Sequence, residues 1–196
     1  MSHDPHSSRA RLLAAGRELF ARHGYEGTST AAIARQAGSS ESQLVRWFGG
    51  KAGLLEAIFE EAWEPLNQRI ADETLGMTDA RAAVVTILLL VLEAFDRDHE
   101  TAAVFLFEGR RVRGDELALS KGFLIFLERL GALITAGQEN GSLPKELDPS
   151  LLRSALVGAA EGMVRDRLVA ARMGRGTPLD SVAIRRVFEA LISHLG

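Results

Sequence analysis

The chain has 196 residues, a formal net charge of −3 at pH 7 and no cysteine. This length can bury a core without covalent staples, and the lack of cysteine excludes disulfide bonds and thiolate metal sites. Residues 1–8 are polar and lack the apolar core of a signal peptide. The most apolar run, residues 82–92, has about half the length that a membrane span requires. These features predict a cytoplasmic protein that does not enter a membrane.

The charge is unevenly distributed along the chain. Residues 1–51 carry seven Lys or Arg and four Asp or Glu, which leaves 16 basic and 22 acidic residues for residues 52–196. A net charge of +3 on the first segment and −6 on the second confines any affinity for phosphate to one end of the chain.

The order of turns in residues 9–55 predicts a helix-turn-helix. A first amphipathic segment ends at Gly24, and the hydroxyl-bearing residues 28–30 precede an alanine-rich second segment, as a helix N-cap does. Gly38 permits the sharp reversal that follows, and Ser40 with a glutamine three residues later has the spacing of a capping box. Three short helices therefore form a compact head, and a long fourth helix follows.

This segment resembles the DNA-binding domain of the TetR family of transcriptional regulators. The matching residues are Leu12, Ala15, Leu19, Phe20, Gly24, Tyr25, Thr28, Ser29, Ile33, Ala34, Ala37, Gly38, Ser40, Leu44, Phe48, Lys51, Leu54 and Leu55. Two positions depart from the family pattern. Ser39 stands where a branched apolar residue is usual, and Val45 stands where an aromatic residue, typically Tyr, is usual. Val45 cannot make the hydroxyl-to-phosphate contact of such a Tyr, so that contact is absent or comes from a neighbour such as Trp47.

The resemblance implies an all-α, nine-helix fold. It implies a DNA-binding domain over residues 1–51 and an effector-binding and dimerisation domain over residues 52–196. It also implies a homodimeric regulator, most often a repressor, that binds palindromic operator DNA and responds to a small molecule. No cofactor is expected.

Polar and charged side chains of the third helix are expected to face DNA. Ser, Gln and Arg hydrogen-bond base edges and phosphates, and the N–H groups at the start of a helix favour a phosphate. The predicted DNA-binding residues are Ser29, Thr30, Ser40, Ser42, Gln43, Arg46, Trp47 and Lys51, with Ser42, Gln43 and Arg46 nearest the bases. The alternative is an ordinary helical bundle that binds no DNA.

The remaining chain predicts six helices and no β-hairpin. Apolar residues recur there at helical spacing, and we expect helices near residues 51–70, 84–95, 101–113, 115–138, 149–173 and 184–195. Pro65 lies inside the first of these and is expected to kink or end it.

The last two helices predict a dimer interface. They combine small residues with a broad apolar stripe, and reading a palindrome requires a two-fold axis. The expected interface consists of Leu152, Ala155, Leu156, Ala159, Ile184, Val187, Phe188, Leu191 and Ile192. Core packing within one chain is the alternative.

The middle helices carry five phenylalanines, which predict either a hydrophobic core or a pocket for a largely apolar or amphipathic effector. Glu161 and Arg165 are spaced to form a surface ion pair or to orient such a ligand. The predicted pocket residues are Phe95, Phe105, Phe107, Phe123, Phe126, Glu161 and Arg165. The basic cluster Arg110, Arg111 and Arg113 is either solvated surface or a contact for an anionic group.

No residue pattern typical of catalysis is evident in the sequence. Asp96, Asp98, His99 and Glu100 lie close together, but at an apparent turn between helices, where they serve as caps rather than as metal ligands. We therefore predict a DNA-binding regulator without catalytic or metal-binding residues. The alternatives are a helical scaffold that uses DNA as a platform for a protein partner, and an all-α enzyme with an unrecognised site.

Overall fold

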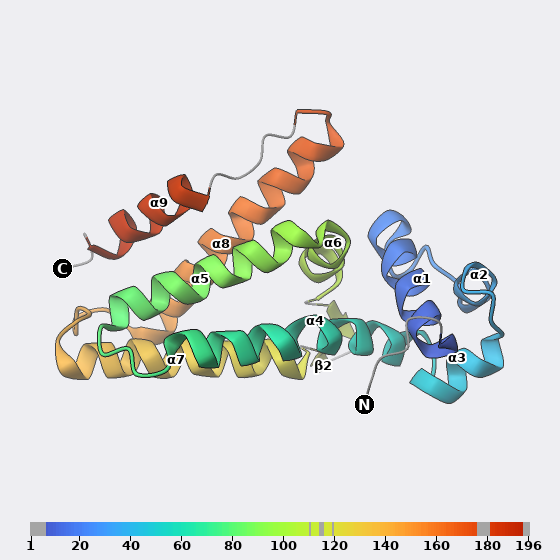
Figure 1. Ribbon diagram of the computed structural model, residues 1–196, viewed down its shortest axis with the longest axis horizontal. Helices are drawn as coiled ribbons and strands as arrows, with labels where there is room; N and C mark the ends of the chain where they lie inside the picture. The colour runs from blue at the N-terminus through green and yellow to red at the C-terminus, as the bar shows by residue number, and fades with distance from the viewer. Residues whose placement is uncertain (1–6, 110, 114–115, 119, 176–180, 194–196) are drawn as a thin grey trace. The chain divides into compact units, whose positions relative to one another are not determined.

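The computed structural model describes residues 7–109, 111–113, 116–118, 120–175 and 181–193. They divide into two compact units, one of Met1–Trp63 with Glu100–Lys121 and the other of Glu64–His99 with Gly122–Gly196. The elements, coloured in chain order in Figure 1, are α1 (Ser8–His23), α2 (Thr30–Gln36), α3 (Glu41–Phe48), α4 (Lys51–Thr74), α5 (Ala80–Arg97), α6 (His99–Glu108), β1 (Arg111–Arg113), β2 (Glu116–Ala118), α7 (Lys121–Asn140), α8 (Pro149–Arg172) and α9 (Ser181–Ser193). Within these residues the predicted nine-helix fold is confirmed.

The first unit contains the helix-turn-helix head. The predicted caps are present: the Ser29 side chain accepts from the Ala32 N–H at the start of α2, and the Ser40 side chain accepts from the Gln43 N–H at the start of α3. Gly38 between these helices has a φ of +57°, a left-handed conformation that residues with a Cβ rarely adopt. The head encloses an apolar core of Leu12, Leu13, Phe20, Ile33 and Leu44.

The first half of α4 and the whole of α6 belong to the same unit. A Cβ at Gly16 of α1 would lie 2.7 Å from the Cδ2 atom of Leu54, so this glycine allows α1 and α4 to approach closely. The Phe105 ring of α6 packs edge-on against Phe59 and Trp63 of α4, at centroid distances of 6.0 and 5.2 Å. These buried rings form the aromatic part of the unit's core.

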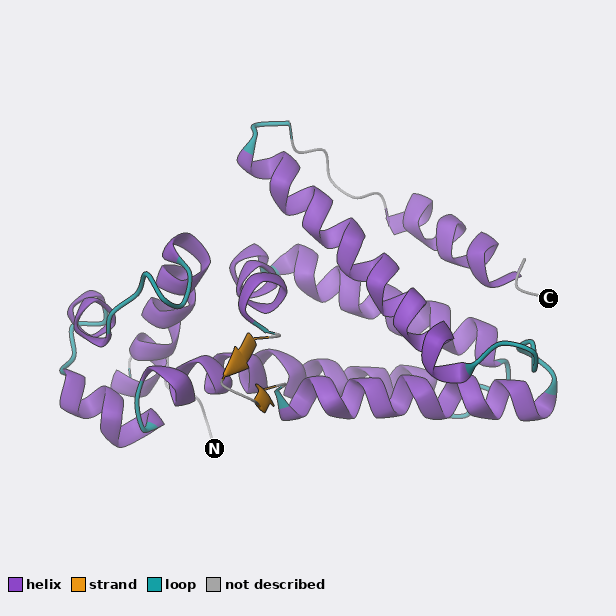
Figure 2. Cartoon of the chain, turned by 180° about the vertical axis from the view of Figure 1, so that it is seen from behind, coloured by secondary structure: helices purple, strands orange, loops and turns teal. Residues whose placement is uncertain are grey.

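A short β-ribbon corrects the predicted course of the chain after residue 100. We expected helices near residues 101–113 and 115–138, but α6 ends at Glu108 and α7 begins at Lys121. Between them β1 pairs antiparallel with β2, with Val112 opposite Leu117 (Figure 2). Gly109 closes the last turn of α6 through its N–H to the Phe105 carbonyl, and a Cβ there would lie 2.4 Å from the same oxygen, so the chain leaves the helix at a residue that glycine suits.

The second unit is built around α5, whose residues are buried over most of its circumference. Both α8 and α9 pack against α5. The second half of α4 packs along α7, where the Asn67 side chain donates to the Gly122 carbonyl at 2.8 Å and Arg129 donates to the Asn67 carbonyl at 2.6 Å. Pro65 does not end α4, which continues to Thr74.

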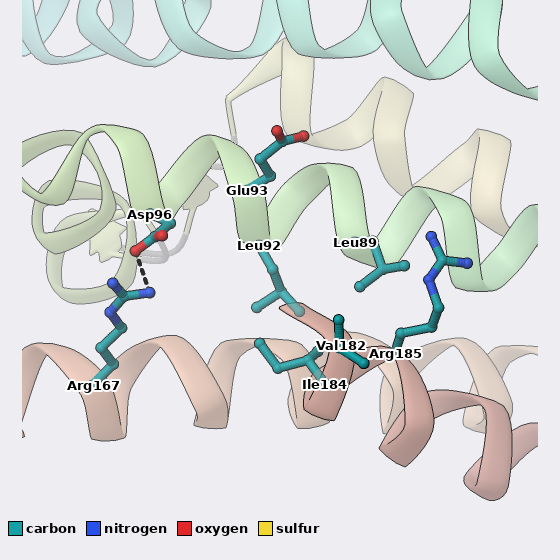
Figure 3. A pocket seen from close by; sticks show the side chains of 8 residues that line it. All are labelled: Leu89, Leu92, Glu93, Asp96, Arg167, Val182, Ile184 and Arg185. Carbon is teal, nitrogen blue, oxygen red and sulfur yellow. Dashed lines mark ion pairs between the residues drawn. The ribbon is translucent and has the colours of Figure 1, made fainter. Parts of the chain in front are cut away.

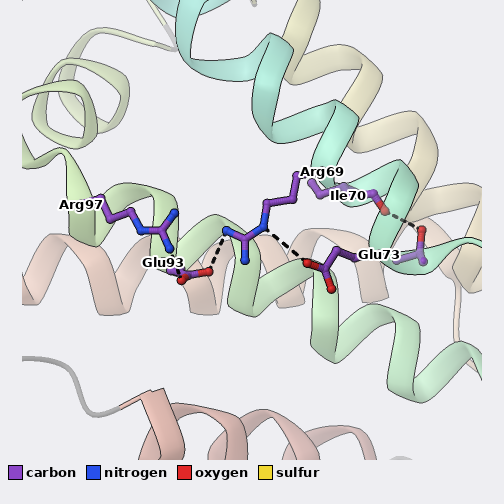
Figure 4. A network of polar contacts seen from close by, with 6 residues as sticks. Arg69, Ile70, Glu73, Glu93 and Arg97 are labelled. Atoms are coloured by element: carbon purple, nitrogen blue, oxygen red, sulfur yellow. Dashed lines mark hydrogen bonds and ion pairs between the residues drawn. The ribbon is translucent and has the colours of Figure 1, made fainter.

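Ion pairs link α4 to α5 in this unit (Figure 4). Arg69 of α4 lies 2.9 Å from Oε2 of Glu93 and 3.6 Å from Glu73, and Arg97 donates to Oε1 of Glu93 at 2.5 Å. All four side chains are partly exposed, so each pair contributes little alone and the group acts as a network. Among the described helices, none is long and apolar enough to cross a membrane.

Candidate nucleic-acid interface

The outward face of α3 combines polar and apolar side chains. Ser42, Gln43 and Arg46 are exposed, whereas Leu44 between them is fully buried and anchors the helix to the head. Val45 and Trp47 are also exposed, at 55% and 52%. Sequence reasoning left Val45 out of the site, yet an exposed branched side chain beside Arg46 suits contact with a thymine methyl group.

Gln43 is held by hydroxyl groups from two other segments. Its Oε1 accepts from Ser39 Oγ at 2.5 Å and from Ser8 Oγ at 3.1 Å, and the two serine hydroxyls lie 3.0 Å apart. Both lone pairs of the amide oxygen are therefore used within the chain. In this arrangement Gln43 offers DNA two N–H donors, which suit guanine, thymine O4 or a phosphate rather than two-point recognition of adenine.

The remaining polar residues of the head serve first as structural contacts. Ser29 and Ser40 cap helices, and Ser42 Oγ lies 2.9 Å from Ser40 Oγ. Thr30 donates to the Glu41 carboxylate at 2.5 Å, which joins the start of α2 to the start of α3. Their predicted contacts with DNA stay predictions, and the structure gives each of them a reason to be polar without DNA.

Lys51 is bound inside the head. Its Nζ donates to the carbonyls of Tyr25 at 2.8 Å and Thr28 at 2.9 Å, and lies 4.2 Å from the centre of the Tyr25 ring. The ammonium group therefore fastens the start of α4 to the loop between α1 and α2. The predicted phosphate contact would have to share this group, so we assign Lys51 a positioning role.

Replacing Lys51 with Met should lower the free energy of unfolding by about 1–3 kcal/mol, because two partly buried carbonyls lose a charged donor. Urea denaturation measures this change, and Lys145→Met at an exposed site outside the head is the matched control. A salt titration of DNA binding tests the alternative, in which Lys51 binds a phosphate. If stability is unchanged and the salt slope falls by about one per subunit, Lys51 is a phosphate ligand after all.

A carboxylate of α6 also reaches the head within the first unit. Glu108 Oε1 accepts from the backbone N–H of Tyr25 at 3.0 Å, directly after the end of α1. Gly24 leaves room for this contact, because a Cβ there would lie 3.2 Å from the same oxygen. The loop that Lys51 holds from one side is therefore held by Glu108 as well.

The five phenylalanines predicted to line a ligand pocket divide between the two units. Phe105 and Phe107 lie in the first, where Phe105 is a core residue and Phe107 is exposed. In the second unit Phe95 is buried, and Phe123 stacks on Phe126 at 5.9 Å. Glu161 is half-buried and Arg165 exposed. The structure does show a pocket of about 410 Å³, but none of these seven residues lines it (Figure 3).

The predicted dimer residues separate into two groups. Leu152 and Leu156 of α8 and Ile184, Phe188 and Ile192 of α9 are buried within the single chain. These five pack on the side of α8 and α9 that contacts α5, and their predicted place in a dimer interface stays a prediction. Ala155, Val187 and Leu191 are exposed and Ala159 is half-buried, so this second group is available to a partner.

The outward side of α8 extends this exposed surface and was missed from the sequence. Leu151, Val169 and Met173 are exposed apolar residues on it, and Gly158 and Gly162 lie between them at helical spacing. A Cβ at either glycine would have no heavy atom within 4 Å. We call this set, with Ala155, the α8 stripe. The signal available in the sequence was that the exposed positions of this helix are more often apolar than charged.

The acidic cluster near residue 98 belongs to a helix junction. Asp98 is the C-cap of α5, and His99 Nε2 lies 3.6 Å from Asp96 Oδ1. Asp96 also forms an ion pair with Arg167 of α8. Among the described residues, no group of three His, Cys, Asp or Glu is placed to hold a metal ion.

Comparison with known proteins identifies relatives that cover most of the chain. Residues 12–58 match the family model of bacterial regulatory proteins of the tetR family. The fatty acid metabolism regulator protein of Bacillus subtilis (strain 168) is 24% identical over 158 residues, which cover 79% of this chain and 80% of that protein. The HTH-type transcriptional regulator UidR of Escherichia coli (strain K12) is 23% identical over 166 residues, 85% of this chain and 84% of that one.

Solved structures show the same fold. The transcriptional regulator FadR from Bacillus subtilis, in complex with stearoyl-CoA, superimposes with a TM-score of 0.78 at 21% identity, covering 94% of this chain and 97% of that chain. The fatty acid degradation regulator FadR from Bacillus halodurans gives a TM-score of 0.75, also at 21% identity, with the same coverage.

Proposed function

Since the chain belongs to the TetR family of bacterial regulatory proteins, we propose that it is a homodimeric repressor that a small apolar or amphipathic effector releases from a palindromic operator. The observation that carries the proposal is α3, a helix fixed by buried Leu44 that presents Ser42, Gln43, Val45 and Arg46 to solvent. Such a helix fits the major groove of DNA. Because its DNA lies in the cytoplasm, the regulator would act there, and the proposal includes no enzymatic activity.

The basic and the acidic segments of the chain would have different functions. Residues 1–51, with a net charge of +3, would bind the operator, and the acidic residues 52–196 would bind the effector and the second subunit. In the dimer, the α8 stripe would pack with Ala159, Val187 and Leu191 against the same surface of the partner, as two-fold symmetry requires. An effector that binds the dimer shape with low DNA affinity more tightly would weaken DNA binding, and DNA would weaken effector binding by the same factor.

The relatives support a lipid-like effector. One curated relative is a regulator of fatty acid metabolism, and the solved structure of FadR from Bacillus subtilis contains stearoyl-CoA. We propose an effector with a long apolar part and one polar end.

Selection of bound fragments from randomised duplex DNA tests the proposal most directly. The purified protein should enrich two inverted half-sites whose centres lie about one helical turn apart, or a multiple of it. If it retains all duplexes equally, or retains none, the protein is not a sequence-specific regulator. The enriched duplex then serves as the operator in the experiments below.

Arg46→Ala should reduce the preference for this operator over a mutated half-site by about 1–3 kcal/mol, because an exposed arginine of α3 can bind a guanine at two points. Competition binding measures the preference. Arg22→Ala is the control, since Arg22 lies on α1 and pairs with Glu18. If Arg46→Ala weakens binding to every sequence alike, Arg46 contacts the DNA backbone instead.

A further inference from the structure

The second unit contains a pocket of about 410 Å³ between α5, α8 and α9 (Figure 3). This volume is within the range of small-molecule sites, roughly 300–1,000 Å³. The middle of the pocket is aliphatic, because Leu89 and Leu92 of α5 lie opposite Val182 and Ile184 of α9. Ile184 and Leu92 are buried, Leu89 is half-buried and Val182 is exposed at the rim. The wall therefore suits a hydrocarbon.

The two carboxylates that line the pocket already have cationic partners. Asp96 pairs with Arg167, whose side chain is only 14% exposed. Glu93 binds a guanidinium at each oxygen, Arg97 at Oε1 and Arg69 at Oε2. The negative charge of both carboxylates is therefore compensated by arginines, and Arg167 is already paired with Asp96.

Arg185 is the charged side chain that the pocket offers to a ligand. It lies at the opposite end from the Asp96–Arg167 pair (Figure 3). Its ion pair with Glu189 is long, at 3.8 Å, and both side chains are 53% exposed. An exposed pair of this kind contributes little and is easily exchanged. A guanidinium binds a carboxylate through two parallel hydrogen bonds, which a ligand carboxylate could make in place of Glu189.

We propose that this pocket binds the anion of an aliphatic carboxylic acid, with the hydrocarbon between α5 and α9 and the carboxylate on Arg185. The inference rests on the proposed function, since it names the effector class and its site. An acyl thioester has an uncharged carbonyl where the free acid has its charge, so the free acid is the form that satisfies Arg185.

The pocket wall also includes a contact to α4. Glu93 lines the pocket and holds Arg69 of α4 at 2.9 Å. Because α4 begins at Lys51, which fastens it to the head, a ligand in the pocket that moves Glu93 acts through Arg69 on the helix that directly follows α3. Binding of the acid should therefore weaken operator binding, and operator binding should weaken acid binding by the same factor.

Calorimetric titration of the full chain with decanoate, decan-1-ol and decanoyl-CoA tests the site. Decanoate should bind most tightly. Arg185→Gln should weaken decanoate binding by about tenfold or more while leaving decan-1-ol binding unchanged, because it removes only the charged contact. Arg186→Gln, a neighbouring exposed arginine that does not line the pocket, is the matched control. Val182→Trp adds a ring at the exposed rim, where the core need not repack, and should block all three probes.

Three results would overturn the inference: no decanoate binding, equal losses in Arg185→Gln and Arg186→Gln, or unchanged binding in Val182→Trp. Tighter binding of decanoyl-CoA than of decanoate would overturn the assignment of the free carboxylate. Operator binding is measured separately without these probes. If the protein binds the operator but not decanoate, the proposed pocket is refuted and the proposed DNA-binding function is not. If the protein binds decanoate but shows no preference for any DNA sequence, only the proposed DNA-binding function is refuted.

Discussion

Replacing Val187 and Leu191 together by Glu should convert the protein to a monomer and weaken operator binding by about 10²–10⁴-fold, because the two heads would no longer bind as a linked pair. The two side chains are 45% and 47% exposed on one flank of α9, while Phe188 on the adjoining flank is completely buried. Glu at both positions would place unpaired charge in a desolvated seam between subunits. Sedimentation velocity and operator titration measure the two effects.

Arg186→Glu, which introduces the same side chain at an exposed position of α9 away from this flank, should leave both assembly and operator binding intact. Circular dichroism should show unchanged helix content in the double variant, since neither position is buried. A stable dimer despite both glutamates would move the interface away from α9. By contrast, Phe188→Glu would unfold the unit and could not locate the interface.

Phe105→Ala should lower the free energy of unfolding by about 3–5 kcal/mol, the usual cost of removing a buried aromatic ring. Phe105 packs edge-on against Phe59 and Trp63, so no neighbour can fill the space without moving another ring. Phe107→Ala, two positions along the same helix but exposed, should change stability by less than about 0.5 kcal/mol. Chemical denaturation of both variants measures the contrast. A cost below about 1 kcal/mol for Phe105→Ala would mean that its ring lines a cavity rather than a core.

The helices and caps of the head could be predicted because their signals are local. Ser29 and Ser40 cap the helices that directly follow them, and Gly38 marks the turn between those helices. Each of these contacts spans only a few residues, so their spacing in the sequence was sufficient. The ribbon after α6 lacked such a signal, because its strands are three residues long.

The candidate sites depended on contacts that sequence spacing does not contain. The stripe on α9 predicted an apolar face, but only packing against α5 shows that Ile184, Phe188 and Ile192 face inward and Leu191 outward. The place of Lys51 at the start of a helix predicts a phosphate contact, and spacing does not reveal the carbonyls that it binds, because they lie 26 and 23 residues away. The pocket was missed because its wall joins three helices that are separate in the sequence.

The two glycines of the α8 stripe, Gly158 and Gly162, would affect which chains can form a dimer with each other. Since a Cβ at Gly158 or Gly162 meets nothing within 4 Å, the protomer itself gains nothing from the missing side chains, and each glycine costs its helix about 1 kcal/mol relative to Ala. In the proposed dimer, the missing side chains allow the main chain of α8 to approach the main chain of the partner's helix closely. A related regulator with larger side chains at these positions would collide with the partner helix. The two glycines would then discriminate against mixed dimers, so that several regulators of one fold can coexist in a cell without exchanging subunits.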